Sequence, residues 1–270
     1  MPIIIHSMNI EMAKIDFTNT RFAAILSQNA RKEQHIMADI EDLKKAVKVC
    51  MFDQYGTVVD MQGGLTKIAE PYLKSKGSTL APHRFVTWWR RTHFENSMID
   101  ALLHREHTPY REIGHMSVAH VLERAEIDYT MDEVRALVSE IEKLTCFPEV
   151  PEALAKLQTK YKLVVLSNGD PDMLQEALRW HKVPFDQVIS VSEANAFKPH
   201  RATYEKGAEL AGVRLDEVLF VANHTFDCIG AKAAGMHAAF IDRRSRPFER
   251  TPYKPDIVVP TMTDLADAMV

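Results

Sequence analysis

The rhythm of hydrophobic and polar positions changes near residue 147. Before it, the apolar run VKVCMF over residues 47–52 predicts one short buried strand. The following segments, LTKIAEPYLKSKG and then most of 82–142, repeat apolar residues at helical spacing. Gly77 is suited to end the first of these helices. Thr130 and Glu133 have the spacing of a capping box at the start of a later helix.

After residue 147, predicted strands and helices alternate. The apolar runs KLVVL, FDQVISV, EVLFVA and HAAFI read as strands, separated by amphipathic helical segments. This alternation is typical of a parallel sheet with helices on both faces. We therefore predict an α/β fold with a Rossmann-like parallel-sheet core over 47–60 and 147–270. A helical cap domain would be inserted over 61–146, and a helical extension would precede the core over 1–46.

Composition and charge narrow the classes of function. The chain is 46% hydrophobic and 26% charged, as globular proteins are. Its net charge of -4 gives no general attraction to nucleic acid or anionic membranes. No apolar run approaches the roughly 20 residues that span a bilayer, and the first residues lack the pattern of a signal peptide. We therefore expect a protein that binds neither nucleic acid nor membrane.

The cysteines and the N-terminal segment support two further expectations. Cys50, Cys146 and Cys228 are distant and odd in number, which favours buried thiols in a reducing compartment. We therefore expect a cytoplasmic location. Ile36, Ile40 and Leu43 have helical spacing in the N-terminal segment. This segment is predicted to pack on a partner subunit, which would make the protein a homodimer.

Polar residues follow the predicted strands at several points. Asp53 follows the first strand, Ser167 and Asn168 follow KLVVL, Lys198 follows ISVSEANAF, and Asp227 ends ANHTFD after EVLFV. Taken singly, each is also compatible with a turn, a solvated charge or a helix cap. However, the carboxyl ends of parallel strands meet at one edge of the sheet. The sequence therefore predicts that these side chains converge on one site.

The motifs FDQYGT, LSNG, FKPH and VANHTFD occur in the order of the four motifs of the haloacid dehalogenase (HAD) superfamily, which the chain resembles from residue 47 to 270. The resemblance implies the HAD fold and a nucleophilic Asp53. Most members are phosphatases with a second aspartate two residues later, where this chain has Tyr55. Magnesium prefers several oxygen ligands, whereas this site offers Asp53 and Asp227 with Lys198 competing for their charge. We therefore expect no metal and no cofactor.

The pattern Asp-x-Tyr-Gly-Thr resembles the metal-independent L-2-haloacid dehalogenases, as does the Trp89-Arg90 pair in the cap. Lys198, followed six residues later by Tyr204, also matches. The resemblance implies that Asp53 displaces halide from a short 2-haloalkanoic acid. Water would then hydrolyse the aspartyl ester and release a 2-hydroxy acid.

Roles for the other residues follow from that resemblance. Arg90 and Asn168 would stabilise the departing halide, and Asp227 would orient Lys198 or the hydrolytic water. His224 would help to activate that water, or else anchor its loop. The predicted residues that bind the small-molecule carboxylate substrate are Ser167, Gln54, Tyr55, Tyr204, Trp89 and Asn223.

Other functions stay open at this point. The altered fourth motif, Ala222-Asn223-His224, leaves room for the same displacement on another leaving group, as in the ring opening of azetidine-2-carboxylate. A magnesium-dependent phosphatase and a binding module without activity are the less favoured alternatives. The basic run 243–250, RRSRPFER, is predicted to lie at the rim of the site or in solvent.

Overall fold

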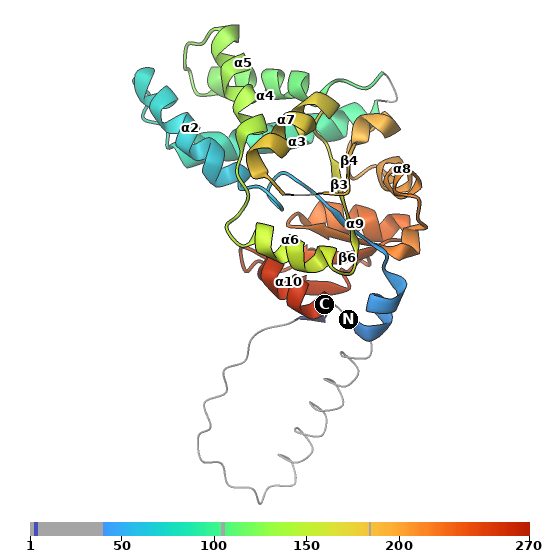
Figure 1. Ribbon diagram of the computed structural model, residues 1–270. Helices are drawn as coiled ribbons and strands as arrows, with labels where there is room; N and C mark the ends of the chain where they lie inside the picture. Colours follow the sequence, from blue (N-terminus) through green and yellow to red (C-terminus); the bar gives the residue numbers. More distant parts are fainter. Residues whose placement is uncertain (1–2, 5–39, 104–105, 184) are drawn as a thin grey trace, which may run out of the picture.

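Seven parallel strands form one sheet in the order β1-β7-β6-β5-β2-β3-β4 (Figure 1). The structure, a computed structural model, describes residues 3–4, 40–103, 106–183 and 185–270. Within them the strands are β1 Ile3–Ile4, β2 Val49–Phe52, β3 Lys162–Ser167, β4 Gln187–Ser190, β5 Val218–Ala222, β6 His237–Ile241 and β7 Ile257–Val259.

Strand β2 is central and lies between β3 and β5. Phe52 at its end pairs in register with Val165 of β3 and Val221 of β5. Every residue of β2 and β5 is buried, which agrees with their continuous apolar sequences. The chain runs from β2 toward β4 on one side and from β5 toward β7 on the other. A crevice is expected at such a reversal of strand order, beyond the carboxyl ends of β2, β3 and β5.

Helices cover both faces of this sheet. On one side α6 and α10 pack together, and on the other α8 packs against α9 (Figure 1). The bounds of the core helices are α6 Val150–Gln158, α7 Pro171–His181, α8 Arg201–Ala211, α9 Thr225–Ala234 and α10 Met262–Met269. Short 3-10 helices span Val191–Ala194 and Leu215–Glu217. The α/β fold with a Rossmann-like parallel sheet is thus confirmed.

Of the five α-helices described between β2 and β3, the first four, α2 to α5, form a separate layer at the carboxyl edge of the sheet (Figure 1). The chain enters and leaves this layer side by side, since Val59 pairs with Cys146 and the Phe147 N–H donates to the Val58 carbonyl at 3.1 Å. We propose 61–146 as the cap domain on this basis. Its elements are α2 Met61–Ser75, α3 Pro82–Leu102, α4 Tyr110–Arg124, α5 Met131–Ser139 and the 3-10 helix Glu140–Lys143.

Local sequence signals explain where two cap helices begin. The Asp60 carboxylate accepts a hydrogen bond from the Gly63 N–H at 2.9 Å and so caps α2. The capping box of Thr130 and Glu133 is present at the start of α5, as predicted. Gly77 has φ +65° just after α2, the left-handed conformation that commonly ends a helix.

One core residue connects the cap to the sheet. Asp170, which follows β3, accepts hydrogen bonds from the backbone N–H groups of Tyr110 and Arg111 at 2.8 and 2.9 Å. These N–H groups lie at the start of α4 and have no acceptor within the helix, so the Asp170 carboxylate of the core satisfies the first turn of a cap-domain helix. The Tyr110 ring stacks on Tyr55 with 5.8 Å between centroids. Asp170 thereby fixes where the cap meets the loop after β2.

Three elements were absent from the sequence predictions. Strand β7, helix α10 and the two-residue β1 complete the far edge of the core. Of the predicted extension over 1–46, residues 1–2 and 5–39 lie outside the described part of the chain; residues 40–46 are helical, and Leu43 is buried in the core. Among the described residues, no helix combines the length and apolarity needed to cross a bilayer. The homodimer and the cytoplasmic location stay predictions.

Candidate active site

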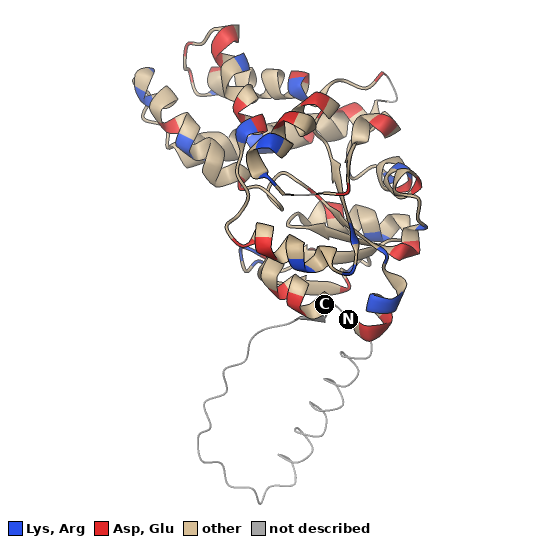
Figure 2. Cartoon of the chain, in the orientation of Figure 1, with Lys and Arg blue, Asp and Glu red and all other residues tan. Residues whose placement is uncertain are grey.

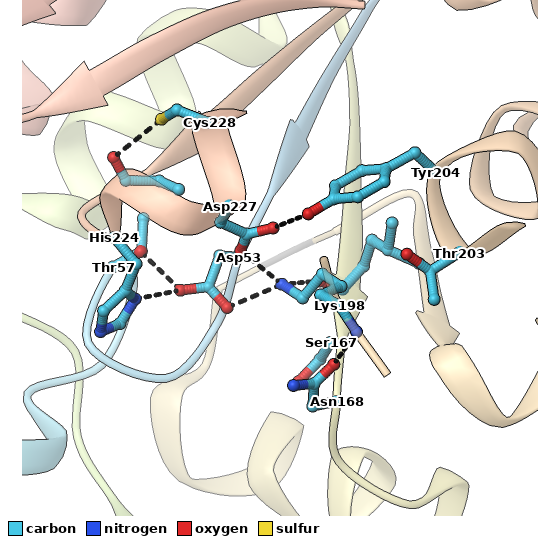
Figure 3. A network of polar contacts seen from close by, with 12 residues as sticks. Asp53, Thr57, Ser167, Asn168, Lys198, Thr203, Tyr204, His224, Asp227 and Cys228 are labelled. Carbon is cyan, nitrogen blue, oxygen red and sulfur yellow. Dashed lines mark hydrogen bonds and ion pairs between the residues drawn. The ribbon is translucent and has the colours of Figure 1, made fainter. Parts of the chain in front are cut away.

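The predicted polar residues meet beyond the carboxyl ends of β2, β3 and β5 (Figure 3). Asp53 directly follows β2 and Asn168 directly follows β3. Lys198 comes from the loop before α8, and its backbone N–H donates to the Asn168 side chain at 3.1 Å. Asp227 lies in the first turn of α9. Residues that are distant in the sequence thus share one site, because the parallel strands end together.

Lys198 is the centre of the buried network. Its Nζ donates to Asp53 Oδ1 at 2.9 Å, to Asp227 Oδ2 at 2.7 Å and to the Leu166 carbonyl at 2.9 Å. An ammonium group has three protons, so its donors are all used. The residue is only 1% exposed. A buried lysine is tolerated here because two carboxylates compensate its charge.

The network keeps Asp53 ionised. Burial alone would raise the pKa of its carboxyl, but the charge of Lys198 and the hydrogen bond from His224 outweigh that effect and hold the pKa below its ordinary value. Burial lowers the pKa of Lys198, and the charges of Asp227 and Asp53 raise it by more. The site therefore presents a carboxylate rather than a carboxylic acid near neutral pH.

The second oxygen of Asp53 has two donors of its own. Thr57 Oγ1 donates to Asp53 Oδ2 at 2.7 Å, and His224 Nδ1 lies 3.2 Å from the same oxygen. Thr57 Oγ1 also accepts from the Asn223 N–H at 2.9 Å, which connects the first and fourth motifs. Sequence reasoning did not single out Thr57, although its place four residues after Asp53 in a tight loop was a usable signal.

The tautomer of His224 follows from its neighbours. Its Nε2 lies 3.4 Å from a guanidinium nitrogen of Arg90, which can only donate. Nε2 is therefore the acceptor, and the proton of the neutral ring is on Nδ1, from which it is donated to Asp53. Arg90 also donates to the Gln62 side chain at 3.0 Å. The imidazole of His224 thus bridges Asp53 of the core and Arg90 of the cap domain.

Gly56 makes this close approach possible. Its φ of +93° lies where residues with a side chain are strained. A Cβ there would lie 2.9 Å from His224 Cε1 and 3.2 Å from an Arg90 guanidinium nitrogen. Only glycine leaves room for both side chains at once.

A cavity of about 700 Å³ opens over Asp53 between core and cap. Seven of the predicted site residues line it: Asp53, Tyr55, Arg90, Asn168, Lys198, Asn223 and His224. Tyr110, which sequence reasoning missed because the cap fold alone brings it there, also lines it. The predicted position of the basic run at the rim is confirmed, since Arg243, Arg244 and Arg246 contribute to the wall.

Four of the predicted substrate-binding residues have side chains outside the cavity. This corrects the expected side-chain contacts of Ser167, Trp89 and Tyr204, whereas the contact predicted for Gln54 is through its backbone N–H. Gln54 is 1% exposed and faces His181 at 3.3 Å; Trp89 is 1% exposed and packs near Phe85. Ser167 is fully buried and accepts from the Gly169 N–H at 3.3 Å. Tyr204 is also fully buried. These side chains pack within the interior and support the site from behind.

Tyr204 and Asp227 form that support. The Tyr204 hydroxyl donates to Asp227 Oδ1 at 2.6 Å, while Asp227 Oδ2 accepts from Lys198 (Figure 3). Asp227 is fully buried and does not line the cavity. It therefore orients Lys198, which was one of its two predicted roles, and does not reach the space over Asp53.

The residues present do not fit a resident magnesium ion. Lys198 Nζ lies between Asp53 and Asp227, where it takes the charge and the oxygen atoms that a divalent cation would need. Tyr55 also stands where most members of the superfamily have a second aspartate. Within the described residues, no group of three His, Cys, Asp or Glu side chains is arranged to hold a metal.

Comparisons with known proteins agree with this geometry. The model of the haloacid dehalogenase-like hydrolase family matches residues 47–235. Haloacetate dehalogenase H-2 of Moraxella sp. (strain B) is 28% identical and aligns over 81% of this chain and 96% of its own. The (S)-2-haloacid dehalogenase of Xanthobacter autotrophicus is 31% identical, over 74% and 77%.

A solved structure supports the same relationship. The L-2-haloacid dehalogenase from Xanthobacter autotrophicus with chloropropionic acid covalently bound aligns with a TM-score of 0.73 and 28% identity. The alignment covers 82% of this chain and 97% of that one. The family model, the relatives and the fold agree, and the chain belongs to the haloacid dehalogenase-like hydrolases.

Proposed function

We propose that this protein is a metal-independent hydrolase that displaces halide from a short 2-haloalkanoic acid and yields a 2-hydroxy acid. The observation that carries the proposal is the buried Lys198, which holds Asp53 as a carboxylate where a magnesium ion would otherwise be needed. The names of the similar dehalogenases, and the covalently bound chloropropionic acid in one of them, support the same chemistry.

In the first step, one oxygen of Asp53 attacks the α-carbon as the carbon–halogen bond breaks. The electron pair of that bond leaves with the halide, and an ester forms between Asp53 and the substrate. Arg90 and Asn168, both in the cavity wall, donate hydrogen bonds as negative charge develops on the halogen. Displacement from behind inverts the configuration at this carbon.

The substrate carboxylate would be held beside Asp53. The Tyr55 hydroxyl has no hydrogen-bond partner among the described residues, and Tyr55 lines the cavity. That hydroxyl atom is itself buried, so it does not face the substrate. The carboxylate would instead be bound by the backbone N–H groups of Gln54 and Tyr55.

In the second step, water adds to the ester carbonyl of Asp53. When Arg90 donates to the halide, its contact with His224 Nε2 is released, and this nitrogen can accept the proton of the attacking water. The ester bond then breaks at the Asp53 carbonyl carbon, and His224 returns its proton to the departing oxygen, which becomes the 2-hydroxyl group. The second proton of the water is released to solvent as Asp53 is restored to a carboxylate and the 2-hydroxy acid leaves. His224 would thus act in ester hydrolysis and not in ester formation.

Single-turnover reaction in oxygen-18 water tests the covalent route. Label is expected first in Asp53, found by mass spectrometry of the peptide that contains it. Label that appears in the product and never in Asp53 would mean that water attacks the substrate directly. Single-turnover kinetics of His224→Ala should show ester formation at its normal rate and slow ester hydrolysis.

A halide-release screen over fluoro-, chloro- and bromo-acids, with EDTA present, defines the leaving group. Chloride release from 2-chloropropionate is expected. Turnover of azetidine-2-carboxylate without such release would favour ring opening by the same mechanism. Hydrolysis of p-nitrophenyl phosphate that EDTA abolishes would favour a magnesium-dependent phosphatase.

A further inference from the structure

The cavity wall carries more positive charge than the proposed reaction uses. Two carboxylates line it, those of Asp53 and Asp60. Six cationic side chains line it as well: Arg90, Arg91, Lys198, Arg243, Arg244 and Arg246. The Asp60 carboxylate is already an acceptor at the start of α2, where it caps the Gly63 N–H.

Three of these cations have carboxylate partners. Lys198 pairs with Asp53 and Asp227. Arg91 pairs with Glu95 at 2.7 Å. Arg243 pairs with Glu149, and its guanidinium lies 3.8 Å from the centre of the Phe147 ring. These side chains are neutralised without any ligand.

The other three cations, Arg90, Arg244 and Arg246, make no ion pair with any described residue. Burial and the charge of Arg244 lower the pKa of the Arg90 guanidinium, whereas the charges of Asp53 and Asp60 raise it. Like charges that face one cavity repel each other unless an anion lies between them. The proposed reaction assigns Arg90 to the halide, which leaves Arg244 and Arg246 without a counter-ion.

The loop that carries these two arginines is held against the site. Arg243, Arg244 and Arg246 lie between β6 and β7, among the residues coloured blue in Figure 2. Besides its pair with Glu149, Arg243 donates to the Thr57 carbonyl at 3.2 Å, next to the loop of the nucleophile. The backbone N–H of Arg246 donates to the Asp242 carboxylate at 3.1 Å, which closes a turn. Arg243 thus anchors the loop, while the exposed Arg244 and Arg246 border the cavity.

The cavity is larger than a simple 2-halo acid requires. Its volume of about 700 Å³ corresponds to roughly 20 water molecules at about 30 Å³ each. A 2-halopropionate, with about six non-hydrogen atoms, fills only a small part of such a pocket. Space therefore remains between the reacting carbon and the arginines of the rim.

Resting on the proposed function, we propose that Arg244 and Arg246 form a second anion subsite that binds the distal carboxylate of the substrate. The preferred substrates are then 2-halogenated dicarboxylic acids rather than simple 2-halo acids. Guanidinium groups suit this role because they bind a carboxylate through two parallel hydrogen bonds. The distal carboxylate would supply the counter-ion that the two arginines lack.

The test compares halide release from 2-chloropropionate with release from 2-chlorobutanedioate and 2-chlorohexanedioate. The double variant Arg244→Gln/Arg246→Gln should lower kcat/KM for the better dicarboxylate about tenfold, as expected for two partly exposed ion pairs. Its loss on 2-chloropropionate should be at least fivefold smaller. Arg250→Gln removes the same charge from an exposed arginine of this loop that does not line the cavity, and should change neither.

Two outcomes would overturn the subsite while leaving the proposed function intact. Equal losses on the mono- and dicarboxylate would mean that the arginines only attract anions to the entrance. A wild-type enzyme with no preference for either dicarboxylate would show that the second carboxylate has no site. Both outcomes still require halide release from 2-chloropropionate.

A binding measurement separates the subsite from the reaction. Calorimetry compares unhalogenated hexanedioate with propionate on the wild-type protein and on the double variant. Tighter binding of hexanedioate that is lost in the double variant supports the subsite even if no halide is released from any acid. In that case the subsite stands and the proposed function fails.

Discussion

Replacing Lys198 by methionine tests the central electrostatic claim. The substitution keeps most of the side-chain volume and removes the ammonium group that contacts Asp53, Asp227 and the Leu166 carbonyl at 2.7–2.9 Å. Two carboxylates would then lie buried without a cation, because Asp53 is only 6% exposed and Asp227 is fully buried. Stability and activity should both suffer.

The expected loss of stability is large. Breaking a buried ion pair by removing one partner costs about 3–5 kcal/mol, since the remaining charge stays desolvated. A matched control is Lys232→Met, which removes an ammonium group 2.8 Å from Asp256 where both side chains are more than a fifth exposed. That change should cost about 0–1 kcal/mol. The difference between the two variants isolates the effect of burial.

The pH dependence of the stability of the Lys198→Met variant provides a second test. In the wild type, the pKa of Asp53 is depressed, so its stabilising contribution is present at neutral pH and is lost as the pH falls below the ordinary carboxyl range. Without the cation, burial should raise the pKa of the two carboxyls above their unfolded values. The folded variant then binds more protons than the unfolded chain, and its free energy of unfolding should rise as the pH falls from 8 to 5.5.

Urea unfolding followed by the fluorescence of the three tryptophans measures both effects. The free energy of unfolding is compared for the wild type, Lys198→Met and Lys232→Met at pH 5.5 and 8. A loss in Lys198→Met no larger than in Lys232→Met would refute the idea that one ammonium group neutralises a buried acid pair. So would a Lys198→Met variant whose stability falls, rather than rises, between pH 8 and 5.5.

Three further outcomes are expected. Gly56→Ala should lower kcat for halide release at least tenfold. The Cβ of the alanine would displace His224, and a side chain at this φ would strain the backbone by about 1–2 kcal/mol. A change in kcat under twofold would contradict the close approach of His224 to residue 56. Asp170→Ala should cost about 1–2 kcal/mol in urea unfolding and raise KM through displacement of Tyr110; unchanged stability would show that the cap contact contributes little. Because the pKa of Asp53 is depressed, the rate of ester formation should stay constant from pH 8 to 5.5, and a protonation step within that range would contradict the network.

The core and the position of Asp53 were predictable from the sequence because two simple rules apply to them. Buried parallel strands have continuous apolar sequences, so β2 and β5 were visible as short runs. Polar residues at the carboxyl ends of such strands must lie near one another, and this rule alone places Asp53, Lys198 and Asn168 in one site. Strand β7 and helix α10 were not predicted, because a three-residue strand and an eight-residue helix show little periodicity.

Whether a given side chain reaches the cavity or packs behind it was less predictable from the sequence. Gln54 and Tyr55 are neighbours, yet only Tyr55 reaches the cavity, because alternate residues of an extended chain point in opposite directions. Tyr204 matched a site motif and is nevertheless buried behind Asp227. The position of Tyr110 depends on how the cap docks, which involves Asp170 far away in the sequence. Such contacts follow from packing rather than from local pattern.

A count of formal charges limits how the rim could select a substrate. Asp53, Asp227 and Lys198 sum to -1 with His224 neutral, and Arg90 restores the balance to 0. Arg244 and Arg246 then add +2 to the wall, and the Asp60 carboxylate adds -1, which leaves +1 before a substrate binds. A monocarboxylate brings this total to 0 and a dicarboxylate brings it to -1, so the overall charge alone does not favour the dicarboxylate. Its selection would depend on the local contact between the distal carboxylate and Arg244 and Arg246, which have no carboxylate partner among the described residues and can bind one through paired hydrogen bonds.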